Sequence, residues 1–159
     1  MSSRKVVAIH QAVFQRSLDA VRIALDAGEP VDTLDRSKRT PLFYAAKDGE
    51  LAIAEELIRR GADVNSCDQS LKTPLHFAAA AGHSDLIEIL IKNGAKVDSQ
   101  DSFGNSPLSD AVFESKGRCE IIRQLILAGA DKNLKNHSRV SPLTLAESIS
   151  NYNIVPCFN

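Results

Sequence analysis

The chain has 159 residues, of which 43% are hydrophobic, and a formal net charge of −1. This length is enough for one domain with a substantial core. The near-neutral charge gives no support to a nucleic-acid partner or to an acidic membrane surface, and we expect neither kind of binding. The sequence shows neither the apolar core of a signal peptide nor a stretch long enough to span a bilayer.

The cysteines bear on the compartment of the protein. Cys67, Cys119 and Cys157 are widely separated and odd in number. Disulfide frameworks and zinc sites use even or closely spaced sets, so this pattern predicts three free thiols. Free thiols favour a reducing compartment, and we therefore expect a cytoplasmic location.

A motif recurs along the chain at a nearly constant spacing. Thr40-Pro41-Leu42, Thr73-Pro74-Leu75 and Ser106-Pro107-Leu108 begin 33 residues apart, and Ser141-Pro142-Leu143 begins 35 residues later. Each copy holds two short helical patterns and a turn, and such a unit needs neighbours to bury its apolar faces. The period and the Thr-Pro-Leu-His-x-Ala sequence that begins at Thr73 match the ankyrin repeat. The chain thus resembles an ankyrin-repeat protein.

In chain order, the pattern predicts five repeats in a single domain, 1–159. Their approximate bounds are 7–39, 40–72, 73–105, 106–140 and a truncated 141–159. Helices are expected at 8–15, 18–27, 41–48, 51–60, 74–81, 84–93, 107–114, 119–128 and 142–149, with a short last helix near Ile154. The atypical first repeat, beginning at Val7, and the truncated fifth would act as caps. The two extra residues of the fourth repeat fall near Ser115-Lys116, in the turn between its helices.

The resemblance implies an all-α solenoid of helix-turn-helix pairs linked by β-hairpin-like fingers. One position of the fingers carries a short polar side chain that can bond the backbone of its own turn, namely Asp35, Asp68, Asp101 and Asn136. The family usually has glycine three residues further on, but only Gly104 agrees, and the others are Lys38, Leu71 and Arg139. Either those turns have another shape or each carries about 1 kcal/mol of strain.

One histidine is a candidate for catalytic chemistry. His76 follows the Thr-Pro-Leu motif, and Cys67 is near it in sequence. A Cys–His pair also needs an orienting group and a cleft. The resemblance instead implies that His76, like His10 at the matching position, bonds backbone and threonine around the hairpin. Adjacent carboxylates such as Glu55-Glu56 are interpreted as a solvated outer face. We expect no enzyme activity, no cofactor and no metal site.

The remaining positions predict a surface for a partner. In a stacked array the first helices and the fingers line the concave side. The candidate partner-binding residues there are Arg36, Arg39, Tyr44, Lys47, Asp48, Gln69, Lys72, Phe77, Phe103, Asp110, Phe113 and Glu114. Tyr44, Phe77 and Leu145 share one repeat position that we expect to be exposed, with Phe113 close by. They form either an interaction patch or a set of side chains that tuck between repeats.

Charge gives a second pair of alternatives. The fingers are rich in Arg and Lys, whereas the inner helices carry Asp48, Asp110 and Glu114. This division would suit a partner with an acidic rim, or the basic residues would only keep the finger tips soluble.

The expected function is that of a non-enzymatic protein-binding module that is a monomer when free. Fold alone does not give function, so this step is partly analogy. The repeats fill the chain, and the ending 146–155 with Phe158 resembles the terminal repeat of small single-domain bacterial ankyrin proteins. Some of those are immunity proteins that bind and block a secreted toxin. The most specific hypothesis is therefore a bacterial immunity protein, and the alternative is a cytoplasmic adaptor or regulator that inhibits an endogenous protein.

Overall fold

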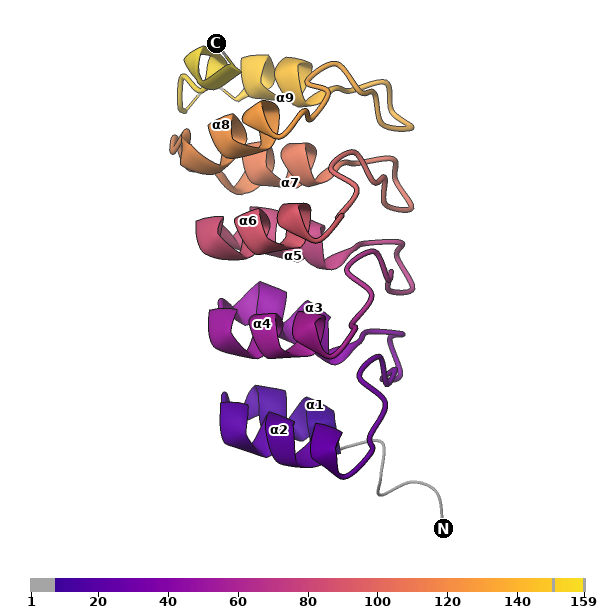
Figure 1. The fold of residues 1–159 in the computed structure, drawn as a ribbon. Helices are drawn as coiled ribbons and strands as arrows, with labels where there is room; N and C mark the ends of the chain where they lie inside the picture. The colour runs from indigo at the N-terminus through magenta and orange to yellow at the C-terminus, as the bar shows by residue number, and fades with distance from the viewer. Residues whose placement is uncertain (1–7, 150, 159) are drawn as a thin grey trace.

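The computed structural model describes residues 8–149 and 151–158 and shows a stack of helix pairs (Figure 1). The helices lie within one residue of the predicted bounds at each end, and η1 is the short last helix expected near Ile154. The predicted start of the first repeat, Val7, lies outside the described residues. The elements are α1 (Ala8–Phe14), α2 (Leu18–Asp26), α3 (Pro41–Asp48), α4 (Leu51–Arg59), α5 (Pro74–Ala81), α6 (Ser84–Lys92), α7 (Pro107–Glu114), α8 (Glu120–Leu127), α9 (Pro142–Ser148) and the 3-10 helix η1 (Val155–Phe158).

The recurring motif marks where four of the first helices begin. Thr40, Thr73, Ser106 and Ser141 are extended N-cap residues, and a proline follows each of them. Proline fits the first helical position because its missing N–H would have no partner there, and its φ already suits a helix. The hydroxyls of Ser106 and Ser141 accept hydrogen bonds from the N–H groups three residues on, which stabilises these helix ends.

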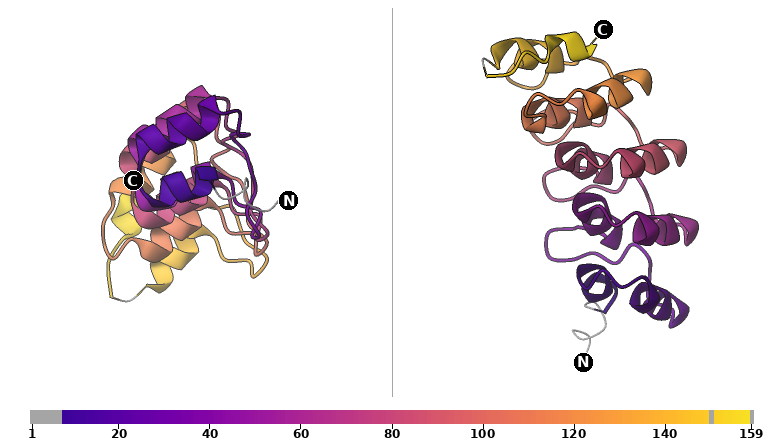
Figure 2. Two further views of the ribbon diagram at one scale, coloured as in Figure 1. Left: turned by 90° about the horizontal axis from the view of Figure 1, so that it is seen from below. Right: turned by 90° about the vertical axis from the view of Figure 1, so that its left-hand side faces the viewer.

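The helices form two layers (Figure 2). The first helices of successive pairs, α1, α3, α5, α7 and α9, pack against one another, and α2, α4, α6, α8 and η1 form the second layer. Leu75 of α5 and Leu90 of α6 are fully buried between the layers, as are their counterparts in the neighbouring repeats. Ala45, Ala78 and Ala111 recur in the first helices and are also buried, and these small side chains let adjacent helices approach closely.

The fingers are closed by the polar side chain that the sequence singled out. Asp68 Oδ1 accepts hydrogen bonds from the N–H groups of Ser70 (2.8 Å) and Lys72 (3.1 Å). Asp35, Asp101 and Asn136 make the same two bonds in their own fingers. The prediction for this position is confirmed. Among the described residues no β-strand is formed, so the fingers are turns that resemble hairpins only in outline.

The turn residues decide between the two alternatives left open by the missing glycines. Lys38, Leu71 and Arg139 have φ of 60°, 59° and 61°, in the left-handed region that Gly104 also occupies at 81°. The turns therefore keep one shape, and the backbone at the three residues that are not glycine carries the strain.

Neighbouring fingers are joined through their backbones. The N–H of Gln69 donates to Ser37 O (3.1 Å), and that of Ser102 donates to Ser70 O (2.9 Å). His137 continues the series by donating its N–H to Phe103 O (3.0 Å). One such bond between each pair of consecutive fingers fixes their spacing, and it places their side chains on a common surface with the first helices.

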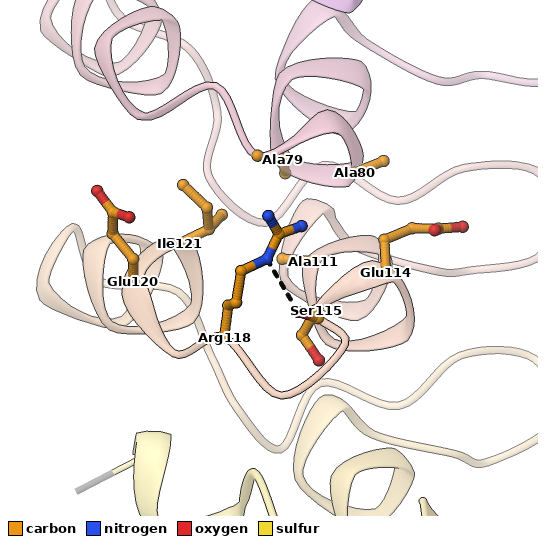
Figure 3. Close-up of a pocket in the computed structure, with 9 residues that line it drawn as sticks. Ala79, Ala80, Ala111, Glu114, Ser115, Arg118, Glu120 and Ile121 are labelled. Carbon is orange, nitrogen blue, oxygen red and sulfur yellow. Dashed lines mark hydrogen bonds between the residues drawn. The ribbon is translucent and has the colours of Figure 1, made fainter. Parts of the chain in front are cut away.

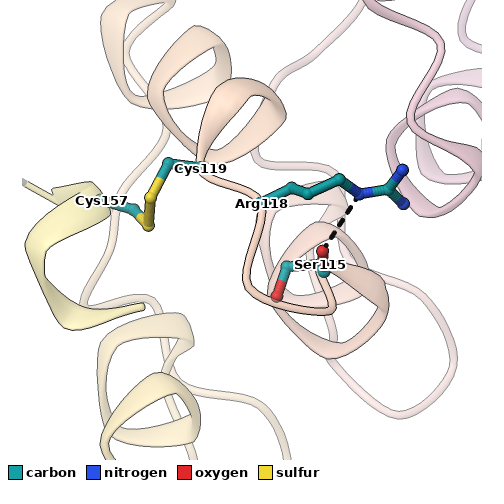
Figure 4. Close-up of a disulfide and its surroundings, with 4 residues drawn as sticks. All are labelled: Ser115, Arg118, Cys119 and Cys157. Atoms are coloured by element: carbon teal, nitrogen blue, oxygen red, sulfur yellow. Dashed lines mark hydrogen bonds between the residues drawn. A yellow bond between two sulfur atoms is a disulfide. The ribbon is translucent and has the colours of Figure 1, made fainter. Parts of the chain in front are cut away.

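The prediction of three free thiols is wrong. Cys119, immediately before α8, forms a disulfide with Cys157 of η1, and only Cys67 among the three is free (Figure 4). The error arose because 38 residues separate the bonded cysteines, and sequence spacing did not show that the truncated fifth repeat folds back onto α8. A disulfide favours an oxidising compartment. Cytoplasmic location stays a prediction that has lost its supporting observation.

Candidate partner-binding face

The fingers and the first helices together form one surface, which we call the inner face. All twelve predicted partner-binding residues belong to its elements: Arg36, Arg39, Gln69, Lys72 and Phe103 lie in the fingers, and Tyr44, Lys47, Asp48, Phe77, Asp110, Phe113 and Glu114 lie in α3, α5 and α7. Their environments differ, however. Several are bonded to other parts of the chain, and this separates the inner face into a filled part and an open part.

Tyr44 belongs to the filled part. Its hydroxyl donates to Asp35 Oδ2 at 2.5 Å, and its ring makes edge contacts with His10 and Phe14. Burial alone would raise the pKa of Asp35, but the hydrogen bonds from Tyr44 and from the backbone of the finger outweigh it and lower that pKa. The expectation that Tyr44 is exposed and free of a structural role is therefore wrong, because Tyr44 is half-buried and braces the first finger.

Phe77 is also half-buried, contrary to expectation. Its ring packs edge-on against Phe43 with centroids 5.6 Å apart. The guanidinium of Arg39 lies 5.1 Å from the Phe77 ring centroid, a cation–π arrangement, and it donates to Asp68 Oδ2 at 3.1 Å. For Tyr44 and Phe77 the alternative of side chains that tuck between repeats is closer to the structure than a free aromatic patch.

Lys72 repeats this arrangement one repeat later. Its Nζ lies 2.6 Å from Asp110 Oδ2 on α7 and 3.7 Å from Asp101 Oδ2. Arg39 and Lys72 form ion pairs within the chain, so their charges stabilise the fold and are not free for a partner. The division between basic fingers and acidic inner helices is thus partly neutralised internally.

Arg39 and Lys72 occupy one position, the last residue of a finger, which we call the junction residue. The next junction residues along the chain are Asn105 and Val140. Asn105 is too short to cross to α9, and its Oδ1 instead accepts a hydrogen bond from Asn136 Nδ2 (2.8 Å). At this third junction a neutral amide pair takes the place of the ion pairs.

A groove of about 450 Å³ opens at this junction, and it is the open part of the inner face. Phe113 is 71% exposed at its edge, and Leu145 is half-buried. The other walls come from the fingers, α7 and the start of α9, and the full lining is Asn105, Ser109, Asp110, Phe113, Asn136, Ser138, Val140, Ser141 and Leu145. We call this space the third-junction groove.

The groove joins only two of the predicted residues, Asp110 and Phe113. Of the rest, Arg36, Lys47, Gln69, Phe103 and Glu114 are exposed elsewhere on the inner face. Val140 and Leu145 also line the groove but are not among the twelve candidates, although Leu145 shares the repeat position of Tyr44 and Phe77 that was expected to be exposed. The available signal was the junction series itself, which changes from Arg and Lys to Asn within three repeats.

A second, smaller cavity lies on the side of the turns between helices (Figure 3). It measures about 50 Å³ and is lined by Ala79 and Ala111 of the first helices and by Arg118, whose Nε donates to Ser115 O at 3.3 Å. This volume holds about one or two waters and is far below that of a ligand pocket.

His76 has the structural role that the resemblance implied. Its Nδ1 accepts from the Thr73 N–H (3.1 Å), its Nε2 lies 3.1 Å from Asn105 O, and the ring is fully buried. Burial lowers the pKa of His76, which favours the neutral ring. His10 makes the matching contact with Arg39 O at 3.0 Å. Both ring nitrogens of His76 are occupied, so the ring has no nitrogen left to activate Cys67.

The outer layer differs from the interpretation of Glu55-Glu56 as solvated. Glu55 is exposed, but Glu56 is only 5% exposed and forms ion pairs with Arg22, Arg59 and Arg60. Arg22 lies on α2, so Glu56 links the first two repeats. The like-charged neighbours face different surroundings because adjacent helical residues point in different directions.

Within 8–149 and 151–158, no helix has the length and apolarity that a membrane crossing would need. In the same part of the chain, no three His, Cys, Asp or Glu side chains gather as a metal site would require.

The family model described as "Ankyrin repeats (3 copies)" matches residues 4–68 and 53–136. The B-cell lymphoma 3 protein homolog of Mus musculus is 32% identical over 144 residues, which cover 90% of this chain and 24% of that protein. The chain therefore spans about a quarter of the length of this relative.

Proposed function

The chain belongs to the ankyrin-repeat family, a family of protein-interaction modules, and on this premise we propose that its inner face binds one partner protein with the third-junction groove as its centre. One observation carries the proposal: the groove is open and bordered by Phe113, whereas Arg39 and Lys72 occupy the matching places in the two repeats before it. Exposed aromatic side chains beside a concave site commonly supply most of the binding energy of an interface.

The scaffold supports binding rather than catalysis. The resemblance predicts that the inner face is concave, and the finger bonds hold its surface in place before a partner arrives. Such preorganisation reduces the entropy cost of association. Since the nitrogens of His76 are bonded within the scaffold, the proposal assigns the protein no catalytic step.

In its most specific form, the proposal is that the partner is a secreted toxin and the chain is its immunity protein. Its support is the resemblance of the terminal repeat to that of small single-domain bacterial ankyrin proteins, some of which are immunity proteins. The alternative is an adaptor or regulator that inhibits an endogenous protein. The mouse relative favours that alternative, because the matching repeats there form part of a much longer protein.

The test begins with capture of the partner from the native host, identified by mass spectrometry, followed by affinity measurements on purified proteins. Replacing Phe103 and Phe113 by Ala should weaken binding by about 2–4 kcal/mol, because these rings are exposed and leave the core intact. The matched control is Glu55→Lys with Glu88→Lys, two exposed positions of the outer layer. If the control loses the partner and the aromatic variant keeps it, the inner face is not the binding surface.

The immunity form has its own measurement. Cells that express the captured toxin should survive with the parent chain or with the outer-layer control. They should die with the Phe103 and Phe113 double variant, although it is folded. A partner without toxicity would instead support the adaptor or regulator.

A further inference from the structure

The junction residues show how the scaffold fills its own inner face. Arg39 extends from its finger toward the next repeat. There it lies over Phe77 of α5 and donates a hydrogen bond to Asp68 of the next finger. Lys72 extends in the same direction and bonds Asp110, which stands at the repeat position of Phe77. In two consecutive repeats, a long basic junction residue therefore occupies the space between its finger and the first helix of the next repeat.

The third repeat lacks this side chain. Asn105 stands at the junction position, and its Oδ1 is used by Asn136 within the finger layer. A longer side chain at position 105 would reach Leu145 of α9, which stands at the repeat position of Phe77 and Asp110. The space between Asn105 and Leu145 is the third-junction groove. The groove thus has the location that a basic side chain fills in the two repeats before it.

The walls of the groove suit such a side chain. Val140 and Leu145 offer apolar surface to an aliphatic stem, and the exposed ring of Phe113 can lie against a cation. The charged side chain in the lining is the carboxylate of Asp110. Lys72 holds its Oδ2, and among the described residues its Oδ1 makes no hydrogen bond. Asp110 Oδ1 can therefore accept a hydrogen bond from the guanidinium of an arginine.

We propose that the third-junction groove is the receptor for an arginine side chain on an extended segment of the partner protein. This inference rests on the proposed function and names the chemistry of the partner. The stem of the arginine packs on Leu145 and Val140, and its guanidinium lies by Phe113 and donates to Asp110 Oδ1. The Asn105 Nδ2 makes no bond among the described residues and donates to a carbonyl of the segment.

The first test uses three matched probes on the full chain. They are acetylated and amidated pentapeptides of alanine with a central arginine, citrulline or norleucine. Citrulline keeps the shape of arginine without its charge, and norleucine keeps only an aliphatic stem. In ¹H–¹⁵N titrations, the arginine peptide should shift the amides of Phe113, Val140 and Leu145 saturably. It should bind about five- to tenfold more tightly than the citrulline peptide, with an advantage that shrinks in salt.

The second test supplies the missing side chain from the scaffold. Asn105→Arg restores a basic junction residue, so it should occupy the groove and abolish the shifts caused by the arginine peptide. Its melting temperature should equal or exceed that of the parent, which shows that the loss is not unfolding. Phe113→Ala should weaken the arginine peptide. Lys47→Ala, at the same repeat position on α3, should bind it as the parent does.

Two results would overturn the inference. One is equal binding of the arginine and citrulline peptides, or shifts that fall outside the groove. The other is an Asn105→Arg protein that binds the arginine peptide as tightly as the parent. Either result leaves the proposed function standing if the captured partner still depends on Phe103 and Phe113. If the partner binds the outer layer while the peptide still prefers the groove, the proposed function fails and the groove remains an arginine receptor.

Discussion

At the scale of single residues, the finger turns keep a backbone shape that favours glycine even where another amino acid occupies the position. Leu71 holds φ of 59° with its side chain 51% exposed, so it combines backbone strain with little burial. The two hydrogen bonds that Asp68 accepts from the backbone and the bond between neighbouring fingers impose the turn whatever residue stands at 71. The geometry is set by contacts on both sides of the residue, and Leu71 adapts to it.

Leu71→Gly should leave the free energy of unfolding unchanged or raise it by up to about 1 kcal/mol, because glycine adopts positive φ without strain. Urea denaturation measures the difference. Leu71→Ala is the control, since it removes the same side chain but keeps the Cβ, and it should give no gain. A loss above about 1 kcal/mol for the glycine variant would mean that the leucine side chain stabilises the finger through packing.

The same scale shows why the candidate site was only partly predictable. Asp110 and Phe113 were candidates from the sequence, and both line the third-junction groove. The sequence could not show that Tyr44 bonds Asp35 or that Arg39 lies over Phe77, because both contacts depend on how side chains cross between elements. Exposure had been inferred from repeat position alone, and position does not tell whether a neighbour is long enough to cover a ring.

At the scale of elements, prediction was accurate for a physical reason. The helices α3, α5, α7 and α9 share one local signal, a Thr-Pro or Ser-Pro start repeated in phase along the chain, and α3 and α5 also end at a glycine. The groove, by contrast, depends on a residue that is short where its counterparts are long. Such a difference becomes visible only when junction residues are compared with the helices they reach.

The start of α5 provides a pH-dependent element. His76 and Thr73 cap this helix reciprocally, and burial lowers the pKa of His76 below its unfolded value of 6.5. The unfolded chain then binds the proton more readily, so stability is complete above about pH 6.5 and falls as the pH falls toward the folded pKa. Urea unfolding at several pH values should show this decline, and His76→Asn should flatten it. An unchanged pH dependence in the variant would assign the decline to other groups.

At the scale of the whole molecule, the C-terminal end of the stack is held by both packing and a covalent bond. The last elements, α9 and η1, pack on one another and on the preceding pair, and the disulfide closes a loop of 38 residues around them. The ring of Tyr152 adds a contact over Gly117, where a Cβ would come within 3.0 Å of it. Repeat stacks are held by nearest-neighbour contacts, so such a bond stabilises chiefly the repeats within its loop.

Replacing Cys119 and Cys157 by Ser should lower the free energy of unfolding by about 2–4 kcal/mol, following the loop-closure entropy of a bond across 38 residues. Denaturation without reductant should show this difference, and reductant added to the parent should remove it. Cys67→Ser is the control and should change nothing, since that thiol is free and exposed. Identical curves for the double variant and the parent, without reductant, would show that the bond does not stabilise the C-terminal repeats.

The disulfide also limits how far the molecule can be stretched. When the two ends are pulled apart in an optical trap, the 38 residues behind the bond cannot contribute to the extended length. At about 3.4 Å per residue, the oxidised chain should reach full extension roughly 130 Å short of the reduced chain. The pairs before Cys119 would release their length in both forms, whereas most of the fourth and fifth repeats would stay short until the sulfur–sulfur bond is cut. Under load, the protein is thus an extensible tether whose maximum length is limited by the disulfide near its C-terminal end.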